Sequence, residues 1–284
     1  MTDYPQAGRT IVGGIVYEIV RDWAPVPTGI SPGRISTLAV DSQGCLYVLR
    51  RGANPPVLVH GPDGVFRRSF GEGLIFDAHG ISIDAQARVF VVDRDAHVVV
   101  CFSAAGEVLF TLGEPHTPHW QAPFNHPTDL AVAPDGEIYV SDGYGNGNVH
   151  IFSSAGSHLL TFGAVGRGQG EFMTPHALII DRQDRVVVVD REGNRVQLFD
   201  RRGKWLGEYD GLCRPMDVFE RADGALLVPD MVPSVNAFAG GGRIGRGRPS
   251  LNGAHGITGD RAGNIYLADI DPNAITLMRP VKGT

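Results

Sequence analysis

The sequence predicts an all-β protein, a six-bladed β-propeller, and three observations lead to this prediction. One unit of alternating apolar strands and turns occurs six times, with successive copies beginning 43, 49, 48, 40 and 39 residues apart. This spacing is that of a four-stranded propeller blade. Glycine (38) and proline (19) together make up a fifth of the 284 residues, which indicates many short strands joined by turns rather than helices. The six copies begin at Ser36, His79, Thr128, His176, Met216 and His255.

Within each copy we expect a strand, a tight turn, a second strand, a loop, a third strand, a glycine turn and a fourth strand. The last copy has material for only three strands, at 256–259, 265–268 and 274–279. The strand-like segment 14–20 precedes the first copy and belongs to no blade. We predict that it pairs into the sixth blade and closes the ring, because an open sheet edge is a liability. Residues 1–284 then form one domain, with residues 1–10 as a flexible arm.

The composition argues against several classes of partner. Twenty-five basic and 31 acidic residues give a formal net charge of −6, and the arginines are dispersed, so no nucleic-acid surface is expected. No apolar run approaches the roughly 18 residues of a membrane helix, so no membrane association is expected. The N-terminal segment lacks the pattern of a signal peptide, and three scattered cysteines form no disulfide framework. These features favour a cytoplasmic protein.

One position in each copy is expected to lie at the same mouth of the central channel. This position is fourteen residues before the end of the second strand, and the first strand of a propeller blade is the innermost. Histidines occupy it in the second, fourth and sixth copies, which lie about 120° apart around the axis of a six-bladed ring. Three converging imidazoles with an open position form a ligand set of catalytic zinc. We therefore expect His79, His176 and His255 to hold zinc or another divalent transition metal, and acid near about pH 5 to release it.

Two further positions recur around this mouth. The second strand ends with aspartate in five copies, and such repetition indicates a structural role in capping turns through local hydrogen bonds. The next residue is arginine in three copies (Arg51, Arg94 and Arg191), and Tyr144 follows one step later in the third copy. Guanidinium groups at this mouth would suit a small-molecule substrate that carries a carboxylate.

These residues resemble the NHL-repeat six-bladed propellers and, among them, the catalytic domain of peptidyl-α-hydroxyglycine α-amidating lyase (peptidylamidoglycolate lyase). The likeness covers most of the chain and is strongest from residue 77 to residue 199. It is carried by DAHGISID at 77–84, PTDLAV at 127–132 with SDGY at 141–144, PHAL at 175–178 with DRE at 190–192, RG at 51–52 and AHGI at 254–257.

The resemblance implies a zinc-dependent lyase that acts on a carbinolamide, R–CO–NH–CH(OH)–R′, and releases an amide and an aldehyde. Zinc on the three histidines would bind the hydroxyl group, and Tyr144 would act as the base on that hydroxyl. Arg51 and Arg191 would support Tyr144 and hold the substrate. Gly256 stands where the family has an aspartate that helps to bind a structural calcium ion. We therefore expect no calcium ion at this position.

Two other functions stay open at this point. The same three histidines could serve a different metal-dependent reaction, such as hydrolysis of a lactone or an amide, or a hydration, because a metal-activated water suits these reactions equally. Alternatively, the chain could be a non-catalytic NHL-type propeller that binds another protein. The sequence decides neither the natural substrate nor the oligomeric state.

Overall fold

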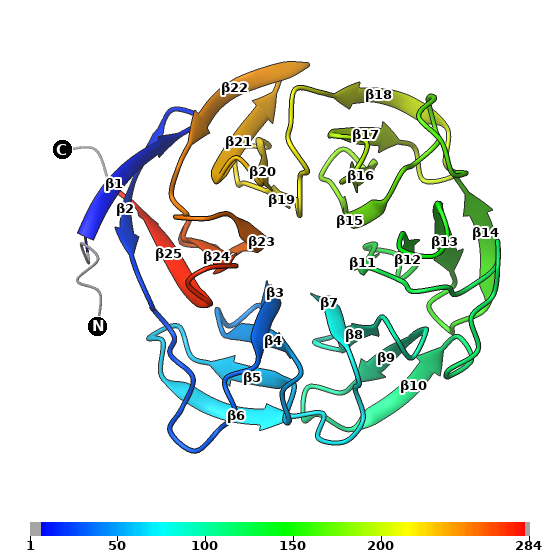
Figure 1. Ribbon diagram of the computed structural model, residues 1–284, viewed down its shortest axis with the longest axis horizontal. Helices are drawn as coiled ribbons and strands as arrows, with labels where there is room; N and C mark the ends of the chain where they lie inside the picture. Colours follow the sequence, from blue (N-terminus) through cyan, green and yellow to red (C-terminus); the bar gives the residue numbers. More distant parts are fainter. Residues whose placement is uncertain (1–6, 282–284) are drawn as a thin grey trace.

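Six β-sheets surround a central axis in the computed structural model, which describes residues 7–281 (Figure 1). Five sheets have four strands, and the sixth has five. No helix occurs among the described residues, and accordingly none there is long and apolar enough to span a membrane. All three cysteines are free. The predicted all-β six-bladed propeller is therefore confirmed.

The six sheets follow one another along the chain, and each begins with its inner strand. The first blade contains β3 (Arg34–Val40), β4 (Leu46–Arg51), β5 (Val57–His60) and β6 (Phe66–Phe70). The second contains β7 (Ala78–Ile83), β8 (Val89–Asp93), β9 (Val98–Phe102) and β10 (Val108–Leu112). The third contains β11 (Asp129–Val132), β12 (Ile138–Asp142), β13 (Asn148–Phe152) and β14 (His158–Phe162).

The second half of the ring repeats this order. The fourth blade contains β15 (Pro175–Ile180), β16 (Val186–Asp190), β17 (Arg195–Phe199) and β18 (Trp205–Tyr209). The fifth contains β19 (Phe219–Glu220), β20 (Leu226–Asp230), β21 (Ser234–Ala239) and β22 (Gly242–Gly247). The sixth contains β23 (Ala254–Gly259), β24 (Ile265–Asp269), β25 (Ala274–Pro280), β2 (Ile15–Val20) and β1 (Ala7–Val12).

The hydrophobic core lies between neighbouring blades. In the fourth blade, Val186, Val187, Val188 and Val189 are consecutive and fully buried. A strand covered on both faces favours such an unbroken apolar run over an alternating one. Val187 and Val189 pack into a cluster with the fifth blade, and Val186 and Val188 into one with the third. The interfaces between blades therefore hold the inner strands, and the channel that they line, in place.

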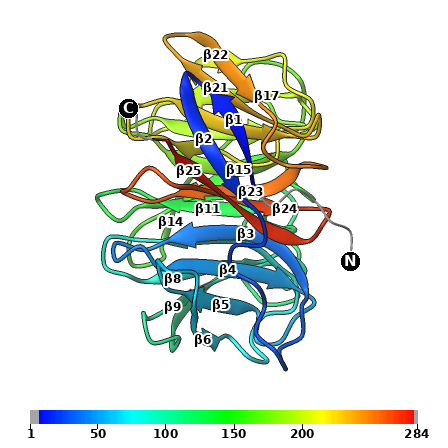
Figure 2. The ribbon, with the colours of Figure 1, turned by 90° about the vertical axis from the view of Figure 1, so that its left-hand side faces the viewer.

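Two N-terminal strands close the ring (Figure 2). As predicted for 14–20, β2 pairs with β25, with Ile19 opposite Met278. The prediction of a flexible arm over residues 1–10 is wrong for 7–10, which belong to β1; residues 1–6 lie outside the described part. The cause is the two-residue turn Gly13-Gly14, with φ of 54° and 80°, which favours a tight hairpin and folds β1 back onto β2.

Contacts with the fifth blade hold this hairpin in place. The Arg221 guanidinium donates to the carbonyl oxygens of Val12 (3.0 Å) and Gly13 (3.1 Å). Gly245 of β22 lies so close to the turn that a Cβ atom there would be 2.6 Å from the backbone nitrogen of Gly13. The hairpin therefore completes the sixth blade and also packs against the fifth.

Four of the five recurring aspartates at the ends of second strands act as caps, as their repetition predicted, whereas Asp269 accepts from the side chain of Thr276. Asp93 accepts hydrogen bonds from the backbone N–H groups of Phe76 (2.6 Å), Asp77 (3.0 Å) and Ala96 (3.1 Å). In the first blade Arg50 replaces the aspartate, is fully buried, and donates to carbonyl oxygens of Ser31, Pro32 and Pro55. These residues fix the loops that lead into the inner strands at the mouth of the channel.

Removal of residues 1–22 should give aggregated or unfolded protein, because it exposes the edge of β25 and the apolar surface under β2. Removal of residues 1–13 takes away only β1 and should give a folded monomer that melts at a lower temperature. Size-exclusion chromatography and thermal melting test both truncations. A stable monomer with unchanged melting after the longer deletion would contradict closure by β2.

Candidate metal centre

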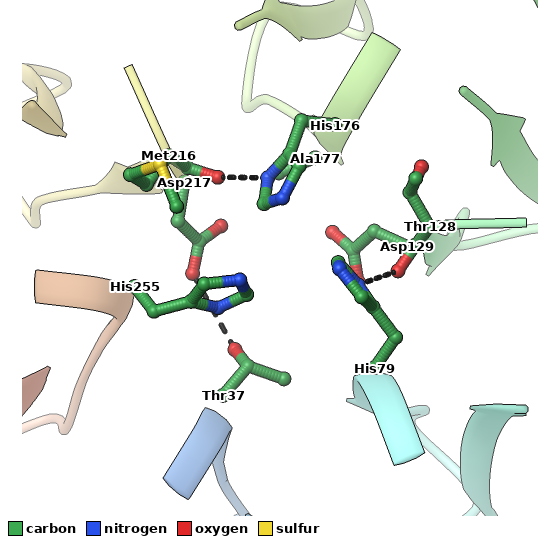
Figure 3. A pocket seen from close by; sticks show the side chains of 9 residues that line it. All are labelled: Thr37, His79, Thr128, Asp129, His176, Ala177, Met216, Asp217 and His255. Atoms are coloured by element: carbon green, nitrogen blue, oxygen red, sulfur yellow. Dashed lines mark hydrogen bonds between the residues drawn. The ribbon is translucent and has the colours of Figure 1, made fainter. Parts of the chain in front are cut away.

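The three histidines of the predicted ring lie in β-bulges of the inner strands. Each histidine lies at the same end of its hairpin as the aspartate, but the residue directly opposite is Ala78 for Asp93, Pro175 for Asp190 and Ala254 for Asp269. The register then shifts at His79, at His176 and at His255. A bulge re-aims the side chain of its extra residue. Here all three imidazoles point toward the axis (Figure 3).

The three imidazoles are close together. Their ring centroids are 5.0 Å apart for His79 and His176, 5.2 Å for His79 and His255, and 5.1 Å for His176 and His255. One ring nitrogen from each lies within 4.8 Å of the other two. They line one pocket at the centre of the channel. The three residues that sequence reasoning singled out therefore form a candidate metal site.

Each imidazole is oriented by a carbonyl oxygen of the next blade. The Nδ1 atom of His79 lies 2.6 Å from the oxygen of Thr128, that of His176 lies 2.6 Å from Met216, and that of His255 lies 2.8 Å from Ser36. A carbonyl oxygen only accepts, so each Nδ1 carries a proton, and each Nε2 keeps its lone pair for a ligand. The acceptors are the three non-histidine members of the predicted ring.

Burial also keeps the imidazoles neutral. Desolvation lowers the pKa of His79 and of His176 well below the ordinary value, and the charge of a neighbouring histidine adds to the effect in each case. Burial and then the charge of Arg51 lower the pKa of His255 to about 3. Three neutral imidazoles with free Nε2 atoms suit a divalent transition metal with an open fourth position.

No carboxylate follows the third histidine, where the resemblance implies one that helps to bind a calcium ion. Gly256 follows His255, and a Cβ atom there would lie 2.8 Å from the Cα atom of Thr37. An aspartate at this position would need the backbone of β3 to move. The structural reason for the glycine is thus the close approach of the first blade to the sixth.

Tyr144 lies on the side of the histidines that carries their Nε2 atoms. Its Oη atom is 3.0 Å from Nε2 of His79 and 3.1 Å from Nε2 of His176. It follows β12, and Gly143 permits this position because a Cβ atom at Gly143 would clash with the carbonyl oxygen of Pro175. The third blade therefore places a phenol beside the candidate metal position between the second and fourth blades.

The predicted arginines surround this tyrosine. Arg191 donates from Nη1 to Tyr144 Oη at 2.8 Å, and its guanidinium lies 5.0 Å from the ring centroid. Arg51 donates from Nε to the carbonyl oxygen of Ala78 at 3.2 Å and lies near enough to Tyr144 to interact electrostatically. The structure thus brings all six predicted site residues together, while their chemical roles stay predictions.

Two carboxyl groups under the histidines, the buried Asp217 and the partly buried Asp129, were missed by the sequence reasoning. Asp129 and Asp217 line the same pocket, and Asp217 is 9% exposed (Figure 3). Burial raises the pKa of Asp129 well above its ordinary value, with Asp217 adding to the effect, and burial raises the pKa of Asp217 to about 7. Asp129 accepts from the N–H of Leu178 (3.2 Å), and Asp217 from that of Ile257 (2.8 Å).

A signal for these carboxyl groups was present in the repeat. The residue after each ring position is small in the histidine blades and polar in the others. The small residues make room for the polar ones: a Cβ atom at Gly80 would lie 2.6 Å from an oxygen of Asp129. The six residues at this level are Thr37, Gly80, Asp129, Ala177, Asp217 and Gly256.

Comparison with known proteins agrees with the propeller fold. Residues 124–227 match DUF5128, a family described as a 6-bladed beta-propeller. NHL repeat-containing protein 3 of Homo sapiens is 31% identical over 232 residues, which are 75% of this chain and 66% of that protein. A probable peptidyl-alpha-hydroxyglycine alpha-amidating lyase of Caenorhabditis elegans is 38% identical over 135 residues, 46% of this chain and 39% of that protein. The chain is a six-bladed β-propeller with NHL-repeat and amidating-lyase homologues.

The chain spans only part of the length of these relatives. It covers 66% and 61% of the two mammalian NHL repeat-containing proteins, and 23% of the peptidylglycine alpha-amidating monooxygenase of Rattus norvegicus, to which it is 30% identical over 62% of its own length. Solved structures show the same fold. A gluconolactonase of Xanthomonas campestris superposes with a TM-score of 0.73 at 17% identity, covering 93% of this chain and 90% of that one.

A virginiamycin B lyase of Staphylococcus aureus superposes on the propeller with a TM-score of 0.68 at 13% identity, covering 93% of this chain and 88% of that one. At these identities the two superpositions show the fold alone. The relation to amidating lyases rests on the sequence matches, and the candidate site rests on the three histidines.

The zinc-reconstituted propeller should hold about one metal ion per chain, since the three Nε2 atoms converge on one site. His79→Ala, His176→Ala and His255→Ala should each lose most of it, because each removes one of three ligands. Metal analysis after dialysis measures the content, and His158→Ala, on the outer strand β14, is the control. Full retention in two of the three ligand variants would exclude a three-histidine site.

Metal retention should extend to lower pH than the ordinary proton affinity of histidine suggests. Each of the three imidazoles has a lowered pKa, to about 3 for His255, so protons compete with the metal only as the pH falls toward that value. This moves the expected release from about pH 5 to below about pH 4. Metal content after dialysis across this range tests the shift, and a release midpoint near about pH 6.5 would contradict it.

Proposed function

We propose that this propeller is a metal-dependent lyase that cleaves the C–N bond of an N-(1-hydroxyalkyl) amide, with zinc as the metal. The observation that carries the proposal is the position of Tyr144 Oη. It lies within hydrogen-bonding distance of two candidate ligand nitrogens and of the Arg191 guanidinium. A potential base therefore stands beside the place where the three imidazoles would hold a metal. The sequence relation to amidating lyases supports this choice of reaction.

A metal held by the three histidines and the side-chain oxygen of Tyr144 would act on the same substrate hydroxyl group. When bound, a divalent metal supplies a Lewis acid that favours the ionised form of a hydroxyl at its open position. Tyr144 Oη is placed to accept the hydroxyl proton. Hydrogen bonds to the charged form of a group favour that form, so Arg191, which donates to this oxygen at 2.8 Å, supports Tyr144 as the base.

The step balances without water. The step begins with Tyr144 as the phenolate. The proton of the substrate hydroxyl passes to Tyr144 Oη, the oxygen electron pair forms the aldehyde C=O bond, and the C–N bond breaks. The leaving amide nitrogen then takes the proton back from Tyr144, which returns the enzyme to its starting state. The products are R–CO–NH2 and O=CH–R′, so every atom of the carbinolamide is accounted for.

Arg51 is the residue best placed to hold an oxygen of the substrate. Its Nη2 atom is buried and has no hydrogen-bond partner among the described residues, while its Nε atom is anchored on Ala78. A buried donor without a partner is costly, and a carbonyl or carboxylate oxygen of a bound ligand would remove that cost. By contrast, Arg191 is already engaged by Tyr144 and by Glu192 (2.8 Å). A small substrate with a carboxylate on R′ fits this arrangement.

The test is turnover of racemic N-acetyl-α-hydroxyglycine by the zinc-reconstituted protein. A lyase releases glyoxylate and acetamide in equal amounts, whereas an amide hydrolase would release acetate. Chelator-treated protein and His79→Ala are the negative controls. Release of acetate in place of acetamide would indicate a hydrolase at the same site and contradict the lyase. A fully metal-loaded protein without turnover would favour a protein-binding propeller.

Tyr144→Phe should lower kcat by about 10²–10⁴ with folding and metal content unchanged, because it removes the accepting oxygen and keeps the ring between its neighbours. Arg51→Lys keeps the positive charge but loses the planar guanidinium group, so a lower kcat in this variant would show that the geometry of the donor matters as well as its charge. Steady-state kinetics per bound metal measure both. Wild-type turnover by Tyr144→Phe would remove this residue from the mechanism.

A further inference from the structure

Asp77 joins two arginines at the mouth of the channel. It is two residues before His79, and its Oδ1 atom lies 3.5 Å from Nε of Arg51 while its Oδ2 atom lies 2.5 Å from Nη2 of Arg94. Its backbone is also held, since its N–H donates to Asp93 (3.0 Å) and its carbonyl oxygen accepts from the N–H of Arg94 (3.0 Å). The carboxylate therefore bridges two cations from a rigid position.

The bridge occurs in one blade only. The residues two positions before the six ring positions include a single acid, whereas the aspartate at the end of the second strand recurs in five blades. A structural requirement of the blade would be expected in most copies, as it is for the caps. The six equivalent residues are Arg34, Asp77, His126, Thr174, Arg214 and Gly253.

Arg94 connects the bridge to Tyr144. Its guanidinium lies 5.5 Å from the centroid of the Tyr144 ring, which Arg191 also approaches at 5.0 Å. A second carboxylate, Asp95, accepts from Nε of Arg94 at 2.8 Å, but its side chain is 51% exposed, so solvent weakens this pair. Cation–π contacts of this kind favour one position of the aromatic ring.

Charge balance gives a second reason for the bridge. Arg51 and Arg94 each approach Tyr144, and without a shared anion their positive charges would repel each other and any metal ion below them. Burial raises the pKa of the Asp77 carboxyl, while Arg51 and Arg94 act in the opposite direction. The Asp77 side chain is 17% exposed, so solvent screens its interactions only in part.

We propose that Asp77 is a positioning residue for the reaction, which sets Arg51 toward the substrate oxygen and Arg94 against the Tyr144 ring. Among the described residues its side chain pairs with the two arginines and not with the three histidines, so it acts through these arginines. The inference rests on the proposed function, in which Tyr144 is the base and Arg51 binds the substrate oxygen, and Asp77 would align both of them.

The experiment compares Asp77→Asn with Asp95→Asn in the zinc-reconstituted protein. Asp77→Asn keeps the shape and removes the charge of the bridge, so kcat for N-acetyl-α-hydroxyglycine should fall by about 10- to 100-fold per bound metal, the scale of a misplaced reacting group. Asp95→Asn removes the other partner of Arg94 and should change kcat by less than about twofold, because surface ion pairs contribute little. Metal content and melting temperature are measured for both variants.

Coupling separates positioning from a merely structural role. If Asp77 acts through Arg94, Arg94→Gln should cost much less kcat in the Asp77→Asn background than in the wild type, because the two residues form one unit. A structural role would instead lower melting and metal content, with wild-type kcat for each remaining metal-loaded chain. Wild-type kcat per metal in Asp77→Asn, an equal loss in Asp95→Asn, or additive effects with Arg94→Gln would each overturn the inference.

A crystal structure of Asp77→Asn tests the same inference independently of turnover. We expect the Arg94 guanidinium to leave the Tyr144 ring and the Arg51 side chain to lose its present orientation. Both arginines in unchanged positions would overturn the positioning role. If the wild-type protein has no carbinolamide turnover at all, the proposed function fails, while displaced or unmoved arginines in this variant still decide the role of the bridge.

Discussion

The site depends on one repeated contact, the hydrogen bond from a histidine Nδ1–H to the carbonyl oxygen of the next blade. It occurs three times, with Thr128, Met216 and Ser36 as acceptors. The contact sets the tautomer, turns Nε2 to the axis and joins each histidine blade to its neighbour. It requires that inner strands of adjacent blades lie close together, which the small residues after the histidines permit. Ring closure by β2 matters to the site for the same reason, because the contact from His255 to Ser36 crosses from the sixth blade to the first.

Residues that recur in most blades support the fold of this molecule, whereas several residues that occur in single blades lie at the candidate site. The capping aspartates recur, and they hold loops. Tyr144, Asp77 and the arginines beside them occur in single blades or in some of them, and they meet at one mouth. These departures from the repeat therefore mark the candidate site.

The electrostatics of the centre follow from burial. Desolvation keeps the three imidazoles neutral and ready to bind a metal, and it raises the proton affinity of Asp129 and Asp217 beneath them. These shifts act oppositely on stability. Neutral His255 favours the folded state more as the pH rises from about 3 to about 6.5, whereas Asp217 favours it less as the pH rises from about 4 to about 7. A metal that binds only the folded protein would add stability across the range in which the imidazoles are unprotonated.

The sequence by itself determined the number of blades, the closure by 14–20, the ring of six positions and the convergence of the three histidines, because each follows from a repeat whose copies share one backbone geometry. Tertiary structure decided what periodicity does not encode. The bulges that turn the imidazoles arise from the register of each hairpin, and the fifth strand of the sixth blade arises from a glycine turn that packs on the fifth blade. The meeting of Asp77, Arg94 and Tyr144 depends on loops of neighbouring blades, whose paths have no equivalents in the repeat. The position of Asp129 and Asp217 beneath the histidines could be recognised only from the tertiary structure, which shows the pocket that they line and the space left beside them by glycine and alanine.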